Sequence, residues 1–92
     1  SVDTAPQDEV VAFNVAEVCF NNQQLDEAQK YYELASKIKP DWPDPILKLG
    51  YVFLNKNDIP RAIEYFEKFL KLEPQDSPRV ALVQQILQAI KK

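Results

Sequence analysis

Apolar side chains recur along this chain every three or four residues, in segments separated by polar breaks. In the first segment they fall at Val11, Val15, Val18 and Cys19. Because one turn of an α-helix takes about 3.6 residues, this spacing places the side chains on one face of a helix. Later segments share the spacing. The pattern predicts five helices, at residues 6–22, 25–38, 44–56, 59–72 and 77–91.

Capping residues and prolines mark the ends of these segments. Asp44 and Ser77 each precede a proline, so each is expected to be the N-cap of a helix with proline in its first turn. Asp58 stands at the start of the fourth segment, where a carboxylate interacts favourably with the helix dipole. Pro40 and Pro74 follow the second and fourth segments and prevent the helices from continuing.

The sequence repeats itself after 34 residues. At this offset Ala28 aligns with Ala62, and Tyr32 aligns with Phe66. Further identical or similar pairs are Asn21 with Asn55, Leu25 with Ile59, Tyr31 with Tyr65, and Pro40 with Pro74. A fixed period of this size is typical of stacked supersecondary units. We therefore expect a lead-in at 1–8, two helix-pair repeats at 9–42 and 43–76, and a fifth helix within 77–92.

Each copy carries small, apolar and aromatic residues at fixed spacings. In the second copy these are Ile46, Leu49, Gly50, Phe53, Ala62, Phe66 and Pro74. In the first copy they are Ala12, Val15, Ala16, Cys19, Ala28, Tyr32 and Pro40. Both sets resemble the W-x₂-L-G-x₂-Y…A-x₃-F…P pattern of the tetratricopeptide repeat (TPR) family. The resemblance covers nearly the whole chain. It implies an all-α, tetratricopeptide-type α-α superhelix of two antiparallel helix hairpins and a fifth, capping helix.

Small residues are expected where the two helices of each hairpin approach most closely. These are Ala16 and Ala28 in the first hairpin and Gly50 and Ala62 in the second. Larger side chains there would push the helices apart, at a cost of about 1–3 kcal/mol. Phe69 stands where the family has a small residue, so we expect it to pack on the last helix.

The segment 77–92 has two interpretations. It is apolar on one side and polar on the other, and so resembles the solvating cap helix that often closes such arrays. The alternative is a truncated third repeat. The sequence leaves both interpretations open.

Composition restricts the chemistry of this chain. Its 92 residues include no histidine, one cysteine (Cys19) and one glycine (Gly50). Histidine-based catalytic triads, His-containing metal sites, zinc sites of paired cysteines and glycine-rich phosphate loops are therefore excluded. No histidine is present to activate Cys19, which we expect to pack inertly on an interior helix face. We expect no enzymatic activity in these residues, no cofactor and no metal.

Charge is distributed unevenly. Residues 1–46 hold nine acidic and three basic side chains, whereas residues 47–92 hold five and eight. The net charge of −3 and the interleaving of acids with bases disfavour nucleic acid as a partner. No apolar run approaches the ~20 residues of a membrane span, and no signal peptide is visible. We expect a soluble protein, with a slight preference for the cytoplasm. Because methionine is absent, we also expect the chain to be a piece of a longer polypeptide.

The family resemblance implies a function in protein binding. In the family, the first helices of successive repeats line a concave groove that holds peptides or helices of partner proteins. Carried onto this chain, the groove residues are Phe13, Glu17, Phe20, Asn21, Leu47, Lys48, Tyr51, Leu54, Asn55, Gln85 and Gln88. Packing explains the phenylalanines and leucines equally well, whereas Glu17 and Tyr51 are less constrained. The two asparagines either bind the backbone of a partner or cap helix ends.

Some family members hold the C-terminal carboxylate of chaperone tails with a clamp of Lys, Asn and Arg side chains. The matching positions here are Phe13, Glu17, Lys48, Pro78 and Leu82. Only Lys48 is basic, and Glu17 would repel a carboxylate. We therefore expect no binding of such tails.

Other functions remain compatible with the sequence. The acidic and basic ends suggest a self-association module in which copies stack end to end. The chain is also compatible with a non-catalytic appendage of an enzyme encoded elsewhere in a longer polypeptide. If a partner avoids the groove, the face that carries Tyr31 and Tyr65 is the next candidate.

Overall fold

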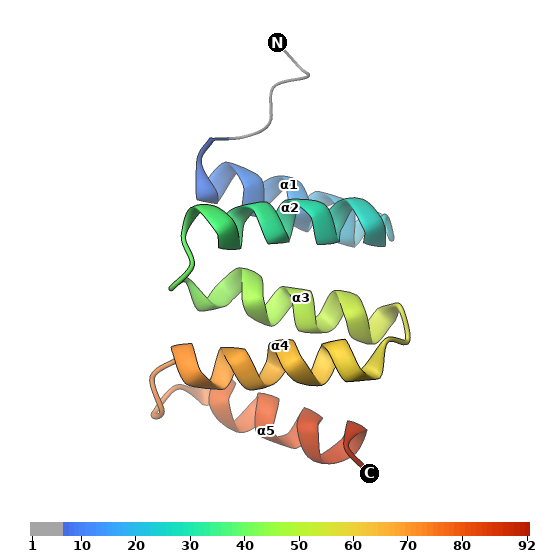
Figure 1. Ribbon diagram of the computed structural model, residues 1–92, viewed down its shortest axis with the longest axis vertical. Helices are drawn as coiled ribbons and strands as arrows, with labels where there is room; N and C mark the ends of the chain where they lie inside the picture. Colours follow the sequence, from blue (N-terminus) through green and yellow to red (C-terminus); the bar gives the residue numbers. More distant parts are fainter. Residues whose placement is uncertain (1–6) are drawn as a thin grey trace.

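The computed structural model describes residues 7–92, and within this range the chain forms five α-helices and no strand. The helices are α1 (Glu9–Asn21), α2 (Leu25–Ile38), α3 (Pro43–Asn55), α4 (Ile59–Leu72) and α5 (Pro78–Ile90). They are stacked in chain order along the longest axis of the molecule, with α1 and α2 at one end and α5 at the other (Figure 1). Short loops join α1 to α2 and α3 to α4, so each pair is an antiparallel hairpin. The predicted all-α hairpin-repeat architecture is confirmed.

The second helix of each hairpin has the predicted bounds, but α1 begins later than expected. Asp8 is its N-cap, and the carboxylate oxygen Oδ1 accepts hydrogen bonds from the amides of Val10 (2.7 Å) and Val11 (3.2 Å). These bonds satisfy two of the backbone donors that the first turn of a helix leaves free. The predicted start at residue 6 lies outside the described residues, and Gln7 and Asp8 are not helical.

The predicted N-cap of the third helix is wrong. Helix α3 begins at Pro43, with Trp42 in the N-cap position, because Pro43 itself has the fixed φ that suits a first helical residue. Asp44 lies within the first turn, and its carboxylate accepts a hydrogen bond from Arg79 instead (2.8 Å). The predicted N-cap of α5 is confirmed, since Ser77 Oγ accepts a hydrogen bond from the amide of Arg79 (3.2 Å).

Both hairpins reverse direction through the same backbone conformation. Gln23 and Asn57, which stand 34 positions apart, have positive φ angles of 63° and 64°. In each turn the following amide donates to a carbonyl of the preceding helix, over 2.8 Å in the first hairpin and 2.9 Å in the second. Asparagine tolerates this left-handed conformation better than glutamine does. The two turns therefore match in backbone conformation.

Each hairpin is closed by an aromatic ring of its second helix against a small residue of its first. A methyl group on the Cα of Gly50 would lie 2.5 Å from Cε1 of the Phe66 ring, so only glycine fits beneath this ring. Tyr32 takes the place of Phe66 in the first hairpin, beside Ala16, and all three side chains are fully buried. The expected close approach is confirmed at Gly50, and Ala16, Ala28 and Ala62 are fully buried, as small residues at such positions would be.

Helix α5 packs against α4 and covers part of its apolar surface. Val83 and Phe69 are fully buried, and Val80 and Leu87 are almost fully buried. The guanidinium carbon of Arg79 lies 5.3 Å from the centroid of the Phe69 ring. The expectation that Phe69 packs on the last helix is therefore confirmed.

Candidate protein-binding surface

The predicted site residues lie on α1, α3 and α5, and they differ in exposure. Leu47 is only 5% exposed and belongs to the core. The remaining ten are exposed or half-buried: Phe13, Glu17, Phe20, Asn21, Lys48, Tyr51, Leu54, Asn55, Gln85 and Gln88. We call these ten residues the first-helix surface.

The aromatic members from α1 are partly engaged in packing. The Phe13 ring lies between the rings of Tyr32 and Trp42, with centroid distances of 5.6 Å and 5.0 Å. Phe20 meets Tyr32 edge-on at 6.4 Å. Because Tyr32 belongs to α2 and Trp42 to the loop before α3, Phe13 connects the first helix to both. The phenylalanines thus hold α1 in place and present only part of their surface to solvent.

A polar chain joins α1, α2 and α3. The buried hydroxyl of Tyr32 donates a hydrogen bond to the Glu17 carboxylate. Lys48 Nζ of α3 lies 3.6 Å from Glu17 Oε1, and the two side chains are 32% and 33% exposed. Burial and the bond to Glu17 both raise the pKa of Tyr32 above its ordinary value, so its hydroxyl remains a donor. Glu17 and Lys48, predicted from separate repeats, are therefore brought together by the fold.

The second repeat presents a less charged region. The half-buried Tyr51 ring lies edge-on to Phe66, with a centroid distance of 5.5 Å. Asn55 Nδ2 donates a hydrogen bond to the backbone carbonyl of Tyr51 (2.8 Å), so part of this amide is engaged within its own helix. Of the two roles predicted for Asn55, this contact favours helix-end stabilisation over binding a partner's backbone. No such bond is seen for Asn21 in residues 7–92.

Leu82 of α5 is a surface residue that the predicted groove omitted. Its side chain is 47% exposed. In the 34-residue register Leu82 corresponds to Lys48, and Tyr51 corresponds to Glu17. The register thus relates an apolar pair, Tyr51 and Leu82, to the charged pair Glu17 and Lys48. Applied to α5, the register already placed Leu82 at the position of Lys48, but it did not show that this side chain is exposed.

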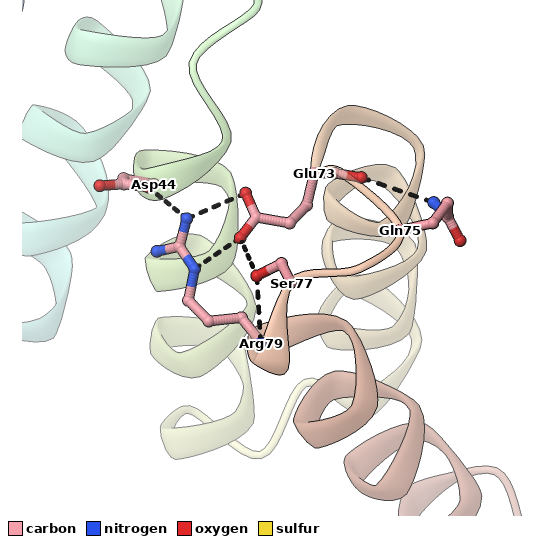
Figure 2. A network of polar contacts seen from close by, with 5 residues as sticks. All are labelled: Asp44, Glu73, Gln75, Ser77 and Arg79. Atoms are coloured by element: carbon pink, nitrogen blue, oxygen red, sulfur yellow. Dashed lines mark hydrogen bonds and ion pairs between the residues drawn. The ribbon is translucent and has the colours of Figure 1, made fainter.

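A partly buried polar network connects α5 to α3 and to the end of α4. Figure 2 shows the Arg79 guanidinium between two carboxylates. Its Nε and Nη2 donate to the two Glu73 oxygens (2.8 Å and 3.0 Å), and Nη2 also donates to Asp44 Oδ1 (2.8 Å). Ser77 Oγ donates to Glu73 Oε2 (2.6 Å). Nothing in the sequence period indicated this network, because its members come from different helices and loops.

Within this network the Glu73 carboxylate is tightly paired with the Arg79 guanidinium. The Glu73 side chain is 6% exposed, whereas that of Arg79 is 39% exposed. Hydrogen bonds from Arg79 lower the pKa of Glu73 below its ordinary value, although burial alone would raise it. The same bonds raise the pKa of Arg79. The network therefore stays charged at neutral pH, and it holds α5 in the position that places Leu82, Gln85 and Gln88.

Shallow depressions occur on the second helices. One, of about 450 Å³, lies between α2 and α4 and is lined by Glu33, Ser36, Lys37, Pro40, Leu49, Tyr65 and Lys68. Another, of about 420 Å³, follows α4 from Pro60 to Lys71. Tyr65 stacks on Phe53 at 5.4 Å, and burial, followed by Glu33 and Glu64, raises its pKa. The first depression includes the face that carries Tyr65, and it is the alternative candidate surface.

The remaining chemical features are few. Cys19 is half-buried and packs against the core. Within residues 7–92, no three His, Cys, Asp or Glu side chains cluster as metal ligands would. In the same part of the chain, no helix has the length and apolar character that crossing a membrane requires.

Two hairpins in register, each closed by an aromatic ring against a small residue, define an α-helical repeat protein. The tetratricopeptide repeat model matches residues 11–41 and 44–76, which is more than half of the chain. The chain therefore belongs to the tetratricopeptide repeat family. No curated protein matches it in sequence. Repeats of this family generally mediate protein–protein interaction and are typically non-catalytic.

Proposed function

We propose that this chain binds a helical or extended segment of another protein on its first-helix surface, as one module of a larger protein. The main support is the pair formed by Glu17 and Lys48. These side chains come from different repeats, lie 3.6 Å apart, and each keeps about a third of its surface exposed. An ion pair in this position contributes little to stability. Its charges remain available to a partner that displaces water.

The surface offers two chemically different regions to a partner. Near α1 it presents a carboxylate and an ammonium group, Glu17 and Lys48. On α3 it presents Tyr51 and Leu54, to which we add the exposed Leu82 of α5. The matching ligand is an amphipathic segment with an apolar anchor near Tyr51 and an uncharged polar or zwitterionic stretch near Glu17. Apolar and aromatic anchors generally dominate such interfaces.

Substitution of Tyr51 tests this proposal. Peptides of about 20 residues, selected from a displayed random library on the wild-type protein, would be measured by calorimetry. Tyr51→Ala is expected to weaken their binding at least tenfold, which corresponds to ~1.4 kcal/mol. Tyr31→Ala on α2 is the matched control and should leave affinity unchanged. Because Tyr51 contacts Phe66, the melting temperatures of both variants must accompany the affinities.

The converse result would relocate the site. If the selected peptides bind Tyr51→Ala as tightly as wild type and a Tyr65→Ala variant more weakly, the depression between α2 and α4 is the binding surface. A second measurement separates this surface from the carboxylate clamps of other family members. Acidic C-terminal tail peptides are expected to show no binding, because Lys48 is the only basic residue at the clamp positions and the neighbouring Glu17 would repel a carboxylate. Micromolar affinity for such a tail would contradict this expectation.

A further inference from the structure

Trp42 is the only tryptophan of the chain, and it lies beside the first-helix surface without belonging to the predicted site. It is half-buried and occupies the N-cap position of α3. Its ring lies 5.0 Å from the Phe13 ring of α1, centroid to centroid, at an angle of 44°. Because Phe13 belongs to the first-helix surface, Trp42 extends this surface onto the loop that joins the two hairpins.

The indole N–H of Trp42 is a hydrogen-bond donor that the fold leaves unused. None of the side-chain hydrogen bonds within residues 7–92 involves it, and no buried polar side-chain atom in that range lacks a partner. The N–H therefore lies where water or a binding partner can reach it. A half-buried tryptophan of this kind offers apolar area and a donor together, a combination that is enriched at protein interfaces.

The backbone of Trp42 is held on both sides. Its amide donates a hydrogen bond to the carbonyl of Lys39 (3.2 Å) in the loop after α2. Pro43 follows, and a residue before proline is restricted to extended conformations such as the φ of −84° and ψ of 115° found here. Asp44 accepts a hydrogen bond from Arg79 (2.8 Å). A side chain on so constrained a backbone loses little conformational freedom when a partner binds.

Trp42 lies at one end of the first-helix surface, and Tyr51 lies beyond the ion pair of Glu17 and Lys48. Helices α1 and α3 run in the same direction (Figure 1). Phe13, which contacts Trp42, comes about one turn before Glu17 on α1, and Lys48 comes about one turn before Tyr51 on α3. In this order along the helices, the charged pair stands between the contact of Trp42 with Phe13 and the ring of Tyr51.

We propose that Trp42 is a specificity-determining anchor of the protein-binding surface. Its ring packs against an apolar side chain of the partner, and its indole N–H donates a hydrogen bond to a backbone carbonyl beside that side chain. The inference rests on the proposed function and narrows the ligand. A matching segment carries two apolar side chains, one for Trp42 and one for Tyr51, on either side of the stretch that crosses Glu17 and Lys48. Tryptophan is among the residues that most often dominate such interfaces.

Two substitutions separate the hydrogen bond from the packing. With the library-selected peptides, Trp42→Phe is expected to lower affinity about threefold to tenfold, as the loss of one hydrogen bond predicts. Because phenylalanine keeps a ring against Phe13, the melting temperature of this variant should change little. Trp42→Ala removes ring and donor together and is expected to lower affinity about tenfold or more. Its melting temperature must accompany its affinity, because this variant also loses the contact with Phe13.

Fluorescence gives a second readout, which a purely structural role would not change. Since Trp42 is the only tryptophan, tryptophan emission reports on this side chain alone. Binding of a selected peptide is expected to shift the emission to shorter wavelength and to protect it from quenching by acrylamide, because the partner removes water from the indole. Tyr31→Ala is the matched control and should show the same shift as wild type.

The outcomes distinguish this inference from the proposed function. Suppose that Tyr51→Ala weakens a peptide, whereas both Trp42 variants bind it as tightly as wild type and its binding leaves the emission unchanged. Trp42 is then a packing residue alone, so the inference is wrong and the proposed function stands. If only Trp42→Ala weakens binding, the hydrogen bond is wrong. If Tyr51→Ala has no effect and Tyr65→Ala weakens binding, the inference and the proposed function are both wrong.

Discussion

The two repeats share one hairpin design but bury very different amounts of their first helices. Helix α3 has seven buried residues, from Pro45 to Phe53, whereas α1 has only Ala12 and Ala16. The apolar pattern is similar in both, so the local sequence does not explain the difference. Helix α3 lies between α2 and α4, while α1 packs mainly against α2. In such an array, the position of a repeat decides whether an apolar side chain is core or surface.

The hairpins also differ in how their two helices meet. In the first, Ala16 lies beside Tyr32, whose hydroxyl reaches Glu17. In the second, Gly50 lies beneath Phe66, which lacks a hydroxyl and contacts Tyr51 edge-on. The first crossing thus combines packing with a polar contact, and the second depends on close packing alone. The following substitutions address this difference, from the largest expected effect to the smallest.

Removal of residues 77–92 should have the largest effect, because it exposes the face of α4 that α5 covers. Phe69 would lose the cover of α5, and the nearly buried Glu73 would lose Arg79. We expect the shortened chain to unfold or aggregate, as judged by circular dichroism and size-exclusion chromatography. Removal of Lys91 and Lys92 alone is the control and should leave the fold intact. A shortened chain that stays monomeric with an unchanged melting temperature would contradict the capping role of α5.

The register of α5 favours a cap over a truncated third repeat. Gln84 occupies the position that corresponds to Gly50, and it is exposed. Even a methyl group at Gly50 would collide with the ring of the paired helix. The first hairpin accommodates Ala16 at this position, but the longer glutamine side chain disfavours a crossing as close as that of Gly50 and Phe66. The capping role of α5 stays a prediction, which the removal of residues 77–92 tests.

Gly50→Ala tests the close packing of the second crossing. The added methyl group would displace the buried Phe66 ring, and we expect a loss of about 2–3 kcal/mol. The better helix propensity of alanine, about 1 kcal/mol, would offset part of a larger strain. Phe66→Leu in the same chain should restore some stability by making room. Ala16→Gly in the first hairpin is the comparison and should cost roughly 1 kcal/mol. Chemical denaturation measures all four proteins.

The sequence predicted the helices well because their signals are local and periodic. Helices α2 and α4 have the predicted bounds, and Ser77 is the predicted N-cap. The prediction of Asp44 as an N-cap was wrong because Pro43 can itself begin a helix, and because the Asp44 carboxylate interacts with Arg79, 35 residues away. Contacts of this kind depend on how helices stack, and no periodic pattern encodes them.

The candidate surface was predictable to a similar degree. The register brought Glu17 and Lys48 onto neighbouring first helices, where they form an ion pair. The register alone did not show that Leu47 is buried or that Leu82 is exposed. Both depend on the position of α5 and on how α3 rotates between its neighbours.

Glu73→Gln tests the network that fixes α5, with an expected loss of about 2 kcal/mol at neutral pH. A buried broken pair can cost more, but Arg79 is 39% exposed and would be hydrated. Since folding lowers the pKa of Glu73, its stabilisation is fully present above the ordinary value of 4.5 and is lost as pH falls below it. The stability difference between wild type and variant should therefore shrink in acid. A difference that is independent of pH would show that charge is not the cause. Glu67→Gln, at an exposed ion pair with Lys91, is the control.

Tyr32→Phe places in the first hairpin the phenylalanine that the second hairpin has at the corresponding position, Phe66. Of these changes it should have the smallest effect on stability. The variant loses one hydrogen bond to Glu17, whose carboxylate keeps Lys48 and gains water. We expect a loss of about 1 kcal/mol. In a domain of this size that lowers the melting temperature by roughly 4–8 °C.

The pH dependence of this loss identifies its origin. Folding raises the pKa of Tyr32, so the hydroxyl stabilises the fold fully below pH 10, its ordinary pKa, and less as the pH rises further. The advantage of wild type over Tyr32→Phe should therefore decline in alkali. The reverse change, Phe66→Tyr, is the matched test, because Tyr51 stands where the first repeat has Glu17. That hydroxyl would find no carboxylate, so the change should destabilise the fold. If Tyr32→Phe melts as wild type does and Phe66→Tyr is neutral, packing alone accounts for both crossings.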